Sequence, residues 1–402
     1  EEVAGKETLP EHEWKTLHRQ RLAESVRSHL ASDVPVGVFL SGGVDSTLLL
    51  ELAVKEGLGD RLNAFTLGGD ATEQDEIGAA RQTAERLGVN HQAVSLSSEE
   101  LDAWVWDALN TFDLPSADGI NLALVSRAAR ARGLSVALSG TGADELHGDY
   151  GHPHRLSRLM RVFSAADGNR NVLGRGVVAA ARWLAEPTRA ERIATLFDCL
   201  DSAEAMILEK RRYFGRSEFL SLSPPGREWV QPGRSRRLVF NREALRALGP
   251  REQIRIADVA GYLKNTLLRD GDTVTMAHGQ EMRMPFLGRR YVECVLGAPE
   301  RATTAAGGGR KTRPGVTIFI GGTGGRCPAQ GGFAMTGAVK PAFMEAVETL
   351  KSQAGFAANG EALLASVASE NNQRRARRLW TLLSLGVWLT RRNVPSPTND
   401  PF

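Results

Sequence analysis

Cysteine is scarce in this 402-residue chain. Its three cysteines, Cys199, Cys294 and Cys327, are odd in number and far apart in the sequence. This spacing excludes a disulfide framework and the close cysteine pairs of a zinc-binding motif. Such a composition is typical of a reducing compartment, so we expect a cytoplasmic protein.

Long apolar runs and an excess of one charge are also missing. No run of 18 apolar residues and no secretory leader occurs, so we expect no membrane contact. The 50 Lys and Arg residues nearly balance the 47 Asp and Glu residues, which argues against the concentrated basic face of a nucleic-acid enzyme. One local cluster, Arg374, Arg375, Arg377 and Arg378, is interpreted as a solvated helix face, with a contact for an acidic partner as the alternative.

The chain does have enough apolar sequence for a substantial core. Hydrophobic residues make up 42% of it, and its length favours one large α/β domain with helical additions. We expect the core of this domain in residues 1–300. An anomalous glycine-rich segment, 301–332, and a C-terminal helical part, 333–402, follow it.

The most informative stretch is VGVFLSGGVDST, at Val36–Thr47. Its apolar start is too short for a helix and predicts a parallel strand that is buried on both faces. The loop Ser41–Gly43 then permits a sharp turn that exposes backbone N–H groups, and Asp45 and Ser46 open a helix. A loop of this kind is suited to bind phosphate.

This loop is not a Walker loop, because the GxxxxGK[ST] spacing and its lysine are absent. The pattern SGGxDS instead resembles the pyrophosphate loop of ATP pyrophosphatases, which cleave ATP between its α and β phosphates and adenylate a carboxylate or carbonyl oxygen. For this motif alone, a glycine turn in an unrelated strand–helix unit is the alternative.

A second glycine loop, ALSGTGADELHGDY, lies at Ala137–Tyr150 after another apolar run. Ligands of an open parallel sheet bind beyond the carboxyl ends of the strands, so both loops are expected at one edge if their strands are neighbours. Asp45 and Asp144 could then share a Mg²⁺ ion that bridges the phosphates. In isolation, Asp144 and Glu145 would only be acids in the first turn of a helix.

Helical and extended patterns alternate along the first half of the chain. Helices are predicted at Glu11–Leu30 and Asp75–Leu87, and short strands at Ala64–Leu67, Gln92–Leu96 and Leu134–Leu138. This alternation predicts a parallel sheet.

Two further predictions concern an acid before a helix and a group of three histidines. Asp118 is expected to cap the helix that follows it. His147, His152 and His154 lack the cysteines or regular i, i+4 pairing of a metal site, so we interpret them as surface or pocket-rim histidines.

Four motifs occur in order, at Val36–Thr47, Asp75–Leu87, Ala137–Tyr150 and Met276–Leu287. Together they resemble the synthetase domain of glutamine-dependent asparagine synthetases over roughly residues 15–300. The resemblance implies a doubly wound, five-stranded parallel sheet of the Rossmann-like, ATP pyrophosphatase type, with additional C-terminal helices. It also implies a ligase of asparagine biosynthesis that uses ATP and Mg²⁺ to convert a carboxylate into an acyl-AMP, which ammonia or an amine then attacks.

The same resemblance assigns site residues. Those expected to contact the nucleotide lie at three strand ends: Leu40, Ser41, Gly42, Gly43, Asp45, Ser46, Leu67, Ser139 and Gly140. Asp45 and Asp144 are expected to be catalytic residues and metal ligands. Glu281 and Arg283, with Asp272, are candidates for orienting substrate charges, although the alternation around Glu281 by itself indicates only a half-buried extended segment.

Two positions depart from the family. Thr141 stands where asparagine synthetases carry a glutamate, and Gly288 stands where they carry an aspartate. Because threonine cannot act as a carboxylate base, the acceptor is expected to differ from aspartate. Relatives that amidate sugars or close peptide and lactam rings vary at the position of Thr141.

The segment Ala305–Gly332 is a larger departure, because ten of its 28 residues are glycine and it lacks the family's Arg-Pro-Lys. One permitted set of codons for Cys327–Gly331, TGT-CCG-GCC-CAA-G, encodes Val-Arg-Pro-Lys when read one base later. We therefore hypothesise a frame-shifted reading. If the sequence stands, a lysine that stabilises phosphate charge is lost, and Lys311 or Arg313 would have to replace it.

The family carries a glutaminase domain before the synthetase domain, and no such domain is expected in this chain. The nitrogen donor would then be free ammonia, an amine of the substrate, or the product of an N-terminal or separate glutaminase domain. Two alternative functions stay open. One is a catalytically impaired nucleotide-binding relative, and the other a lactam-closing, peptide-cyclising or sugar-acid-amidating relative.

Overall fold

The structure is a computed structural model of the chain. It describes residues 10–58, 62–68, 74–116, 118–148, 150–165, 187–215, 241–298 and 373–392, with the shorter pieces 174, 176–180, 183, 218 and 348. The chain divides into two compact units. Unit 1 comprises Glu1–Thr111, Asp118–Asp149 and Leu267–Gly331, and unit 2 comprises Phe112–Ala117, Tyr150–Thr266 and Gly332–Phe402.

Unit 1 is built on a five-stranded parallel sheet with the order β3-β2-β1-β4-β5. Its strands are β1 (Val36–Phe39), β2 (Asn63–Gly68), β3 (Asn90–Ser95), β4 (Val136–Leu138) and β5 (Glu281–Arg283). In the centre, Val38 pairs with Ala64 of β2 and with Leu138 of β4. The predicted doubly wound α/β fold is confirmed.

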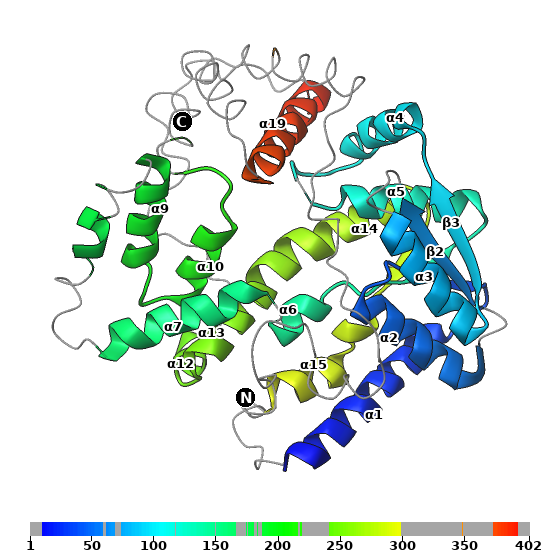
Figure 1. Cartoon of the computed structure of the whole chain (residues 1–402), viewed down its shortest axis with the longest axis horizontal. Helices are drawn as coiled ribbons and strands as arrows, with labels where there is room; N and C mark the ends of the chain where they lie inside the picture. Colours follow the sequence, from blue (N-terminus) through cyan, green and yellow to red (C-terminus); the bar gives the residue numbers. More distant parts are fainter. Residues whose placement is uncertain are drawn as a thin grey trace. The chain divides into compact units, whose positions relative to one another are not determined.

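Helices cover both faces of this sheet (Figure 1). In chain order they are α1 (Glu11–Leu30), α2 (Val44–Ala53) with its π-helical extension η2 (Val54–Leu58), α3 (Gln74–Leu87), α4 (Ser98–Leu109), α5 (Ile120–Ala131), α6 (Ala143–His147), α14 (Leu268–Met276), the 3₁₀ turn η5 (Pro285–Leu287) and α15 (Arg289–Leu296). Within unit 1, α1 packs against both α2 and α15.

Successive strand residues enter different cores, as the two-residue period of a strand requires. Val38 and Leu138 belong to the main core, which also holds apolar side chains of α1, α2, α3 and α15. Phe39 and Ala137 join a second cluster with Ala129 of α5. The sheet is therefore buried on both faces, as the short apolar runs predicted.

The cap of α5 differs from the prediction. Gly119, with a φ of 82°, is the N-cap residue, and Asp118 lies one position earlier. The prediction for Asp118 is wrong because the glycine takes the left-handed conformation between the acid and the helix.

Unit 2 is helical in its described residues. Its helices are α7 (Gly151–Ala165), α9 (Pro187–Asp198), α10 (Ala203–Arg211), α12 (Arg242–Arg246), α13 (Pro250–Asp258), the π-helical segment η4 (Val259–Leu267) and α19 (Gln373–Arg392). Its core includes Leu156, Met206 and Ile254. The expectation of a solvated arginine face is wrong for Arg378, which is buried against Glu218 and Phe214.

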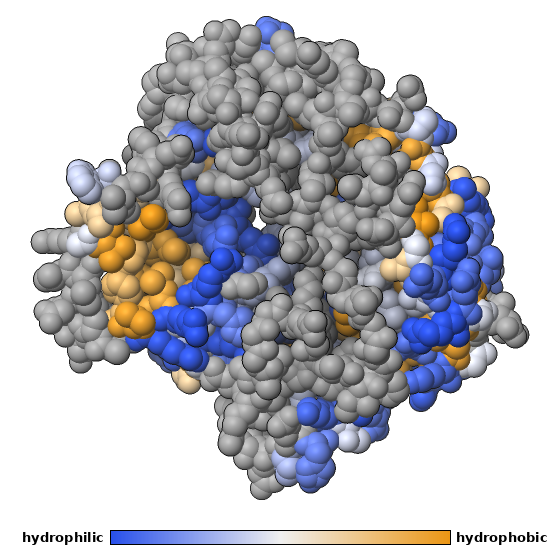
Figure 2. Space-filling view, in the orientation of Figure 1, coloured by the Kyte–Doolittle hydropathy of each residue, from blue (hydrophilic) through white to orange (hydrophobic). Residues whose placement is uncertain are grey.

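The surface of unit 1 over α3 and β3 is mostly hydrophilic (blue in Figure 2). Among the described residues, no helix has the length and apolar character needed to cross a bilayer.

Candidate functional site

The first glycine loop starts where β1 ends, and β2 fixes that start. Leu40 N donates to Phe65 O over 2.8 Å, and Thr66 Oγ1 donates to Leu40 O over 2.6 Å. The side chain of Leu40 is buried in the main core. The backbone of Leu40 is thus held rigidly at the entrance to the loop.

Thr66 is a residue that sequence reasoning missed. Its hydroxyl also lies 2.8 Å from His91 Nε2. Because the hydroxyl donates its proton to Leu40, it accepts from His91, which fixes the proton of the imidazole on Nε2. The only sequence signal was a threonine within the apolar strand before Leu67.

Hydrogen bonds within the loop close its turn. Ser41 N donates to Ser46 Oγ over 3.2 Å, and Ser46 Oγ donates to Gly43 O over 3.2 Å. Gly43 is the N-cap of α2, a helix of 10 residues with Asp45 in its first turn. The loop therefore leads into a helix amino end, where free N–H groups and the helix dipole favour an anion.

The second loop starts at the end of β4 and is held by β5. Ser139 N donates to Arg283 O over 2.9 Å. Thr141 Oγ1 lies 2.8 Å from Ser139 Oγ, and Thr141 N donates to the same oxygen over 3.2 Å. Gly142, with a φ of 89°, then opens α6, which carries Asp144 in its first turn.

The two loops meet at Gly140. A Cβ atom placed on Gly140 would lie 3.1 Å from Asp45 Cβ and 3.5 Å from Ser46 N. Only glycine permits so close an approach without displacing the first loop. Since β1 and β4 are neighbouring central strands, with β2 on the opposite side of β1, the loops lie at the switch point where open parallel sheets bind ligands.

Asp45 and Asp144 are half-buried acids of these loops, whereas the neighbouring Glu145 is only 2% exposed. Within the described residues, no group of three or more His, Cys, Asp or Glu side chains is arranged to hold a metal ion. Two carboxylates suit Mg²⁺, which commonly binds one or two protein acids and takes its other ligands from phosphate and water. The donor set thus fits an ion that arrives with a nucleotide, and the metal role of both acids remains a prediction.

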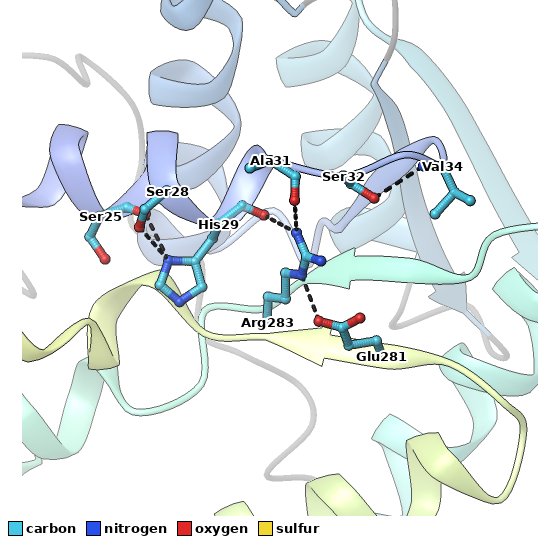
Figure 3. Close-up of polar contacts among 8 residues, drawn as sticks. All are labelled: Ser25, Ser28, His29, Ala31, Ser32, Val34, Glu281 and Arg283. Carbon is cyan, nitrogen blue, oxygen red and sulfur yellow. Dashed lines mark hydrogen bonds and ion pairs between the residues drawn. The ribbon is translucent and has the colours of Figure 1, made fainter.

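Figure 3 shows Arg283 directed at the carboxyl end of α1. Its Nη1 donates to the carbonyl oxygens of His29, over 2.8 Å, and Ala31, over 2.7 Å, and its Nε donates to Glu281 Oε1 over 2.8 Å. The last carbonyls of a helix lack partners within it and carry negative partial charge. The guanidinium is therefore already engaged within the chain, and a role for Arg283 or Glu281 toward substrate remains a prediction.

Two other candidates occupy ordinary structural places. Leu67 is half-buried and packs against Val94, Leu96 and Ala128. Asp272 is exposed on α14. Neither placement tests the roles that the family resemblance implied.

Steric crowding explains why glycine occupies position 288. A Cβ atom at this position would lie 2.1 Å from Ser25 Oγ, which donates to Pro285 O over 2.6 Å. An aspartate at this place would require the Ser25 hydroxyl to move and to lose its bond to Pro285. The serine hydroxyl of α1 thus binds the PFL turn in this chain.

Of the two predicted places, surface or pocket rim, the surface is wrong for His147 and His152, which are 6% and 7% exposed. His147 Nε2 lies 2.8 Å from Tyr291 Oη, and His152 Nε2 lies 3.0 Å from Asp258 Oδ2. These buried partners are distant in sequence, so the local pattern could not reveal them. His154 is exposed. The segment Ala305–Gly332, with Lys311 and Arg313, lies outside the described residues.

Comparison with known proteins relates the chain to one family. The family model described as asparagine synthase matches residues 17–312. A putative glutamine-hydrolysing asparagine synthetase of Mycobacterium tuberculosis H37Rv is 31% identical over 274 residues, which are 66% of this chain and 39% of that protein.

Two further relatives differ in their names. Glutamine-hydrolysing asparagine synthetase 1 of Bacillus subtilis is 29% identical over 298 residues, 72% of this chain and 44% of the relative. The amidase chry2 of Gibberella zeae is 26% identical over 328 residues, 70% of this chain and 45% of the relative. The chain therefore spans less than half the length of these relatives.

Proposed function

Because the chain belongs to the asparagine synthase family, we propose that it is an ATP-dependent ligase that forms an amide through an acyl-AMP. One observation carries this proposal. Two glycine loops with an acid each, Asp45 and Asp144, meet at Gly140 beyond the central strands.

The first loop and the amino end of α2 would bind the phosphates through backbone N–H groups. Ser41, Gly42, Gly43 and Ser46 belong to this part, and Ser139 and Gly140 would contact the nucleotide from the second loop. Asp45 and Asp144 would hold Mg²⁺, which neutralises charge on the departing pyrophosphate. Leu67 would line the adenine pocket, and Leu40 would contact the nucleotide.

The proposed reaction has two balanced steps. An acceptor carboxylate oxygen bonds to the α-phosphorus, and the bond from that phosphorus to the bridging oxygen breaks, so pyrophosphate leaves with the electron pair. The nitrogen of ammonia or an amine then bonds to the acyl carbon, loses a proton and expels AMP. Holding carboxylate and nucleotide together removes much of the entropic barrier to the first step.

The acceptor is proposed to be a carboxylate other than free aspartate. Thr141 replaces the family glutamate, and its hydroxyl is bound to Ser139 Oγ at 2.8 Å. A neutral threonine leaves the site without the negative charge that a glutamate would bring to an acceptor's amino group. The carboxylate of a lactam precursor, a peptide or a sugar acid fits this change. One relative is named an amidase and not an asparagine synthetase, which is compatible with a different acceptor.

A catalytically impaired, nucleotide-binding protein is the second candidate. Thr141 and the missing Arg-Pro-Lys in Ala305–Gly332 favour it, since loss of a phosphate-binding cation removes electrostatic stabilisation of the transition state. Carboxylate-dependent exchange of labelled pyrophosphate into ATP separates the candidates, because only a ligase catalyses it.

The deciding experiment is a screen for AMP release with aspartate, sugar acids and peptide carboxylates, each with ammonia, glutamine or no added nitrogen. The ligase is supported by AMP release that depends on one acceptor and is lost in Asp144→Asn. Release with glutamine only after a glutaminase is added would identify a separate partner. ATP binding without exchange for any acceptor would favour the impaired protein.

A further inference from the structure

Three buried polar side chains of unit 1 form a hydrogen-bonded chain behind the second loop. Tyr291 Oη lies 2.8 Å from His147 Nε2 and 2.8 Å from His18 Nε2. The exposed fractions are 1% for Tyr291, 1% for His18 and 6% for His147. These residues, which we call the His18–Tyr291–His147 chain, come from α1, α15 and α6.

The chemistry of this chain makes both hydrogen bonds compatible. A phenol donates one proton and also accepts, so Tyr291 donates to one imidazole and accepts from the other. The rings are also packed, since the centroids of His18 and His147 lie 5.4 Å apart and those of Trp14 and His18 lie 4.9 Å apart. Hydrogen bonds and ring contacts thus fix the three side chains together.

Helix α6 depends on such external contacts. It has 5 residues, far fewer than a helix needs to be stable alone. Glycines in the left-handed conformation border it, Gly142 with a φ of 89° and Gly148 with a φ of 66°. His147 ends the helix, three positions after Asp144. A displacement of His147 would therefore also move Asp144, which lies in the same short helix.

The other two members of the His18–Tyr291–His147 chain lie on helices that pack toward the helix of the first loop. Tyr291 and His18 lie on α15 and α1, which pack against each other, and α1 also packs against α2. Helix α2 carries Asp45 in its first turn. The His18–Tyr291–His147 chain therefore connects the short helix of one acid to the helices that support the other.

We infer that Tyr291 is a positioning residue whose hydroxyl, through His147, sets the place of Asp144 relative to Asp45 and thereby the affinity for Mg·ATP. The inference rests on the proposed function, because it assigns Asp144 to the metal. It adds His18, His147 and Tyr291 to the site. His147 lies within the second motif, but the motif gave it no such role.

The test begins with Tyr291→Phe, which removes Oη and keeps the aromatic ring. The change removes two hydrogen bonds, to His147 and to His18, of which the first reaches α6. We expect the Mg²⁺ concentration for half-maximal pyrophosphate exchange to rise about fivefold, the equivalent of the one hydrogen bond to His147. The exchange rate at saturating Mg²⁺ should stay within about twofold of the wild type, since the acids remain. His147→Phe should give the same rise, and the double variant no further rise, because each single variant already removes the hydrogen bond between Tyr291 and His147.

Ser126→Ala is the matched control. Ser126 is 0% exposed and donates to Gln280 Oε1 over 2.6 Å, between α5 and the start of β5. Its loss removes one buried hydrogen bond from unit 1 without touching α6. We expect a comparable loss of stability and an unchanged Mg²⁺ requirement. A rise in the control equal to that of Tyr291→Phe would overturn the inference, because general destabilisation would then explain both.

Amide hydrogen exchange of the ligand-free protein gives a readout that does not need activity. Tyr291→Phe should accelerate exchange in residues 143–148, and Ser126→Ala should not. If the wild type neither binds ATP nor exchanges pyrophosphate, the proposed function fails, and the inference is decided by these amides alone. Wild-type exchange of residues 143–148 in Tyr291→Phe would overturn it, as would an unchanged Mg²⁺ requirement in an active enzyme.

Discussion

Acidic side chains differ in burial between the loop edge of unit 1 and a buried cluster of unit 2. In unit 2, Asp258 is 1% exposed and lies 3.0 Å from His152 Nε2. Arg211 donates to both of its oxygens, over 3.1 Å from Nε and 2.8 Å from Nη2. In unit 1, Asp45 and Asp144 are half-buried at the ends of glycine loops.

Aromatic rings complete the unit 2 cluster. The guanidinium of Arg211 lies 3.6 Å from the ring centroid of Tyr262, and His152 stacks on Tyr150 at 5.3 Å. The cluster joins α7, α10 and α13. The comparison teaches that burial with both oxygens bound assigns Asp258 to the fold, whereas Asp45 and Asp144 are only half-buried, at the converging loops where we propose a ligand.

The largest effect is expected from Asp258→Ala. It leaves the half-buried Arg211 without its carboxylate, and breaking a pair that is fully buried costs about 3–5 kcal/mol, which is the upper bound here. Unit 2 should unfold at much lower urea concentration, as measured by hydrogen exchange of α7, α10 and α13. Pyrophosphate exchange should persist wherever the variant is folded.

Asp258→Asn sharpens this test, because its amide keeps the volume and one acceptor oxygen. It should lose less stability than the alanine variant. A folded Asp258→Asn protein that binds ATP normally but has lost pyrophosphate exchange would break the comparison, since the cluster would then take part in the reaction.

Asp144→Asn and Asp45→Asn should show the reverse pattern. Each removes one carboxylate charge from the proposed Mg²⁺ site, and removal of one electrostatic stabiliser lowers rates by about 10²–10³-fold. The urea midpoint of unit 1 should change less than that of unit 2 does in Asp258→Ala, because Asp45 and Asp144 are only half-buried and asparagine keeps the volume and one acceptor oxygen of each side chain. Pyrophosphate exchange and equilibrium unfolding are the paired measurements.

Asp107→Asn is the control for these variants. Asp107 forms an ion pair with Arg127 on the surface of unit 1, and its side chain is 59% exposed. Its loss should leave exchange and stability near wild type. If Asp107→Asn lost as much pyrophosphate exchange, the loss in the loop variants could not be assigned to the proposed Mg²⁺ site.

Much of the fold could be predicted from the sequence, because its signals are local. The apolar run Val36–Leu40, ended by glycines, predicted a buried strand, and Glu11–Leu30 predicted a helix whose bounds the structure reproduces. The expectation that both glycine loops lie at one edge of the sheet depended on β1 and β4 being neighbours. The pairing of Val38 with Leu138 confirms that they are.

The unpredicted features depend on contacts between distant parts of the chain. His147 and Tyr291 are 144 positions apart, and His152 and Asp258 are 106 positions apart. Arg283 reaches a carbonyl 254 positions earlier. A motif gives the type of residue, but only the packed structure shows whether its charge is engaged within the fold, and burial reversed the interpretation of two histidines.

Gly140→Ala tests the convergence of the loops with a smaller change. Its Cβ atom would lie 3.1 Å from Asp45 Cβ, and such overpacking costs about 1–3 kcal/mol. Because the strain is relieved by moving the first loop, the KM for ATP should rise about tenfold. Gly78→Ala on α3, where a Cβ atom meets nothing within 4 Å, should leave this KM unchanged.

The smallest effect is expected from the pH dependence of unit 2. The pKa of His152 lies below its ordinary 6.5, chiefly because of burial; Asp258 raises it, while the charges of Arg211 and Lys210 lower it further. Burial raises the pKa of Asp258, but the hydrogen bonds and charges of His152 and Arg211 together outweigh burial and hold it below its ordinary value. Near neutral pH the folded cluster therefore contains a neutral imidazole and a charged carboxylate.

The sign of the pH effect follows from linkage. As the pH falls through 6.5, the unfolded state binds a proton at residue 152 before the folded state does, so unit 2 loses stability. His152→Asn removes this titration and can still donate a hydrogen bond to Asp258. Between about pH 7.5 and 5.5, the urea midpoint of the wild type should fall further than that of the variant. A wild type that gains stability relative to His152→Asn on acidification would show that Asp258 charges the imidazole, and the cluster would then be an ion triad and not a charged pair with a neutral neighbour.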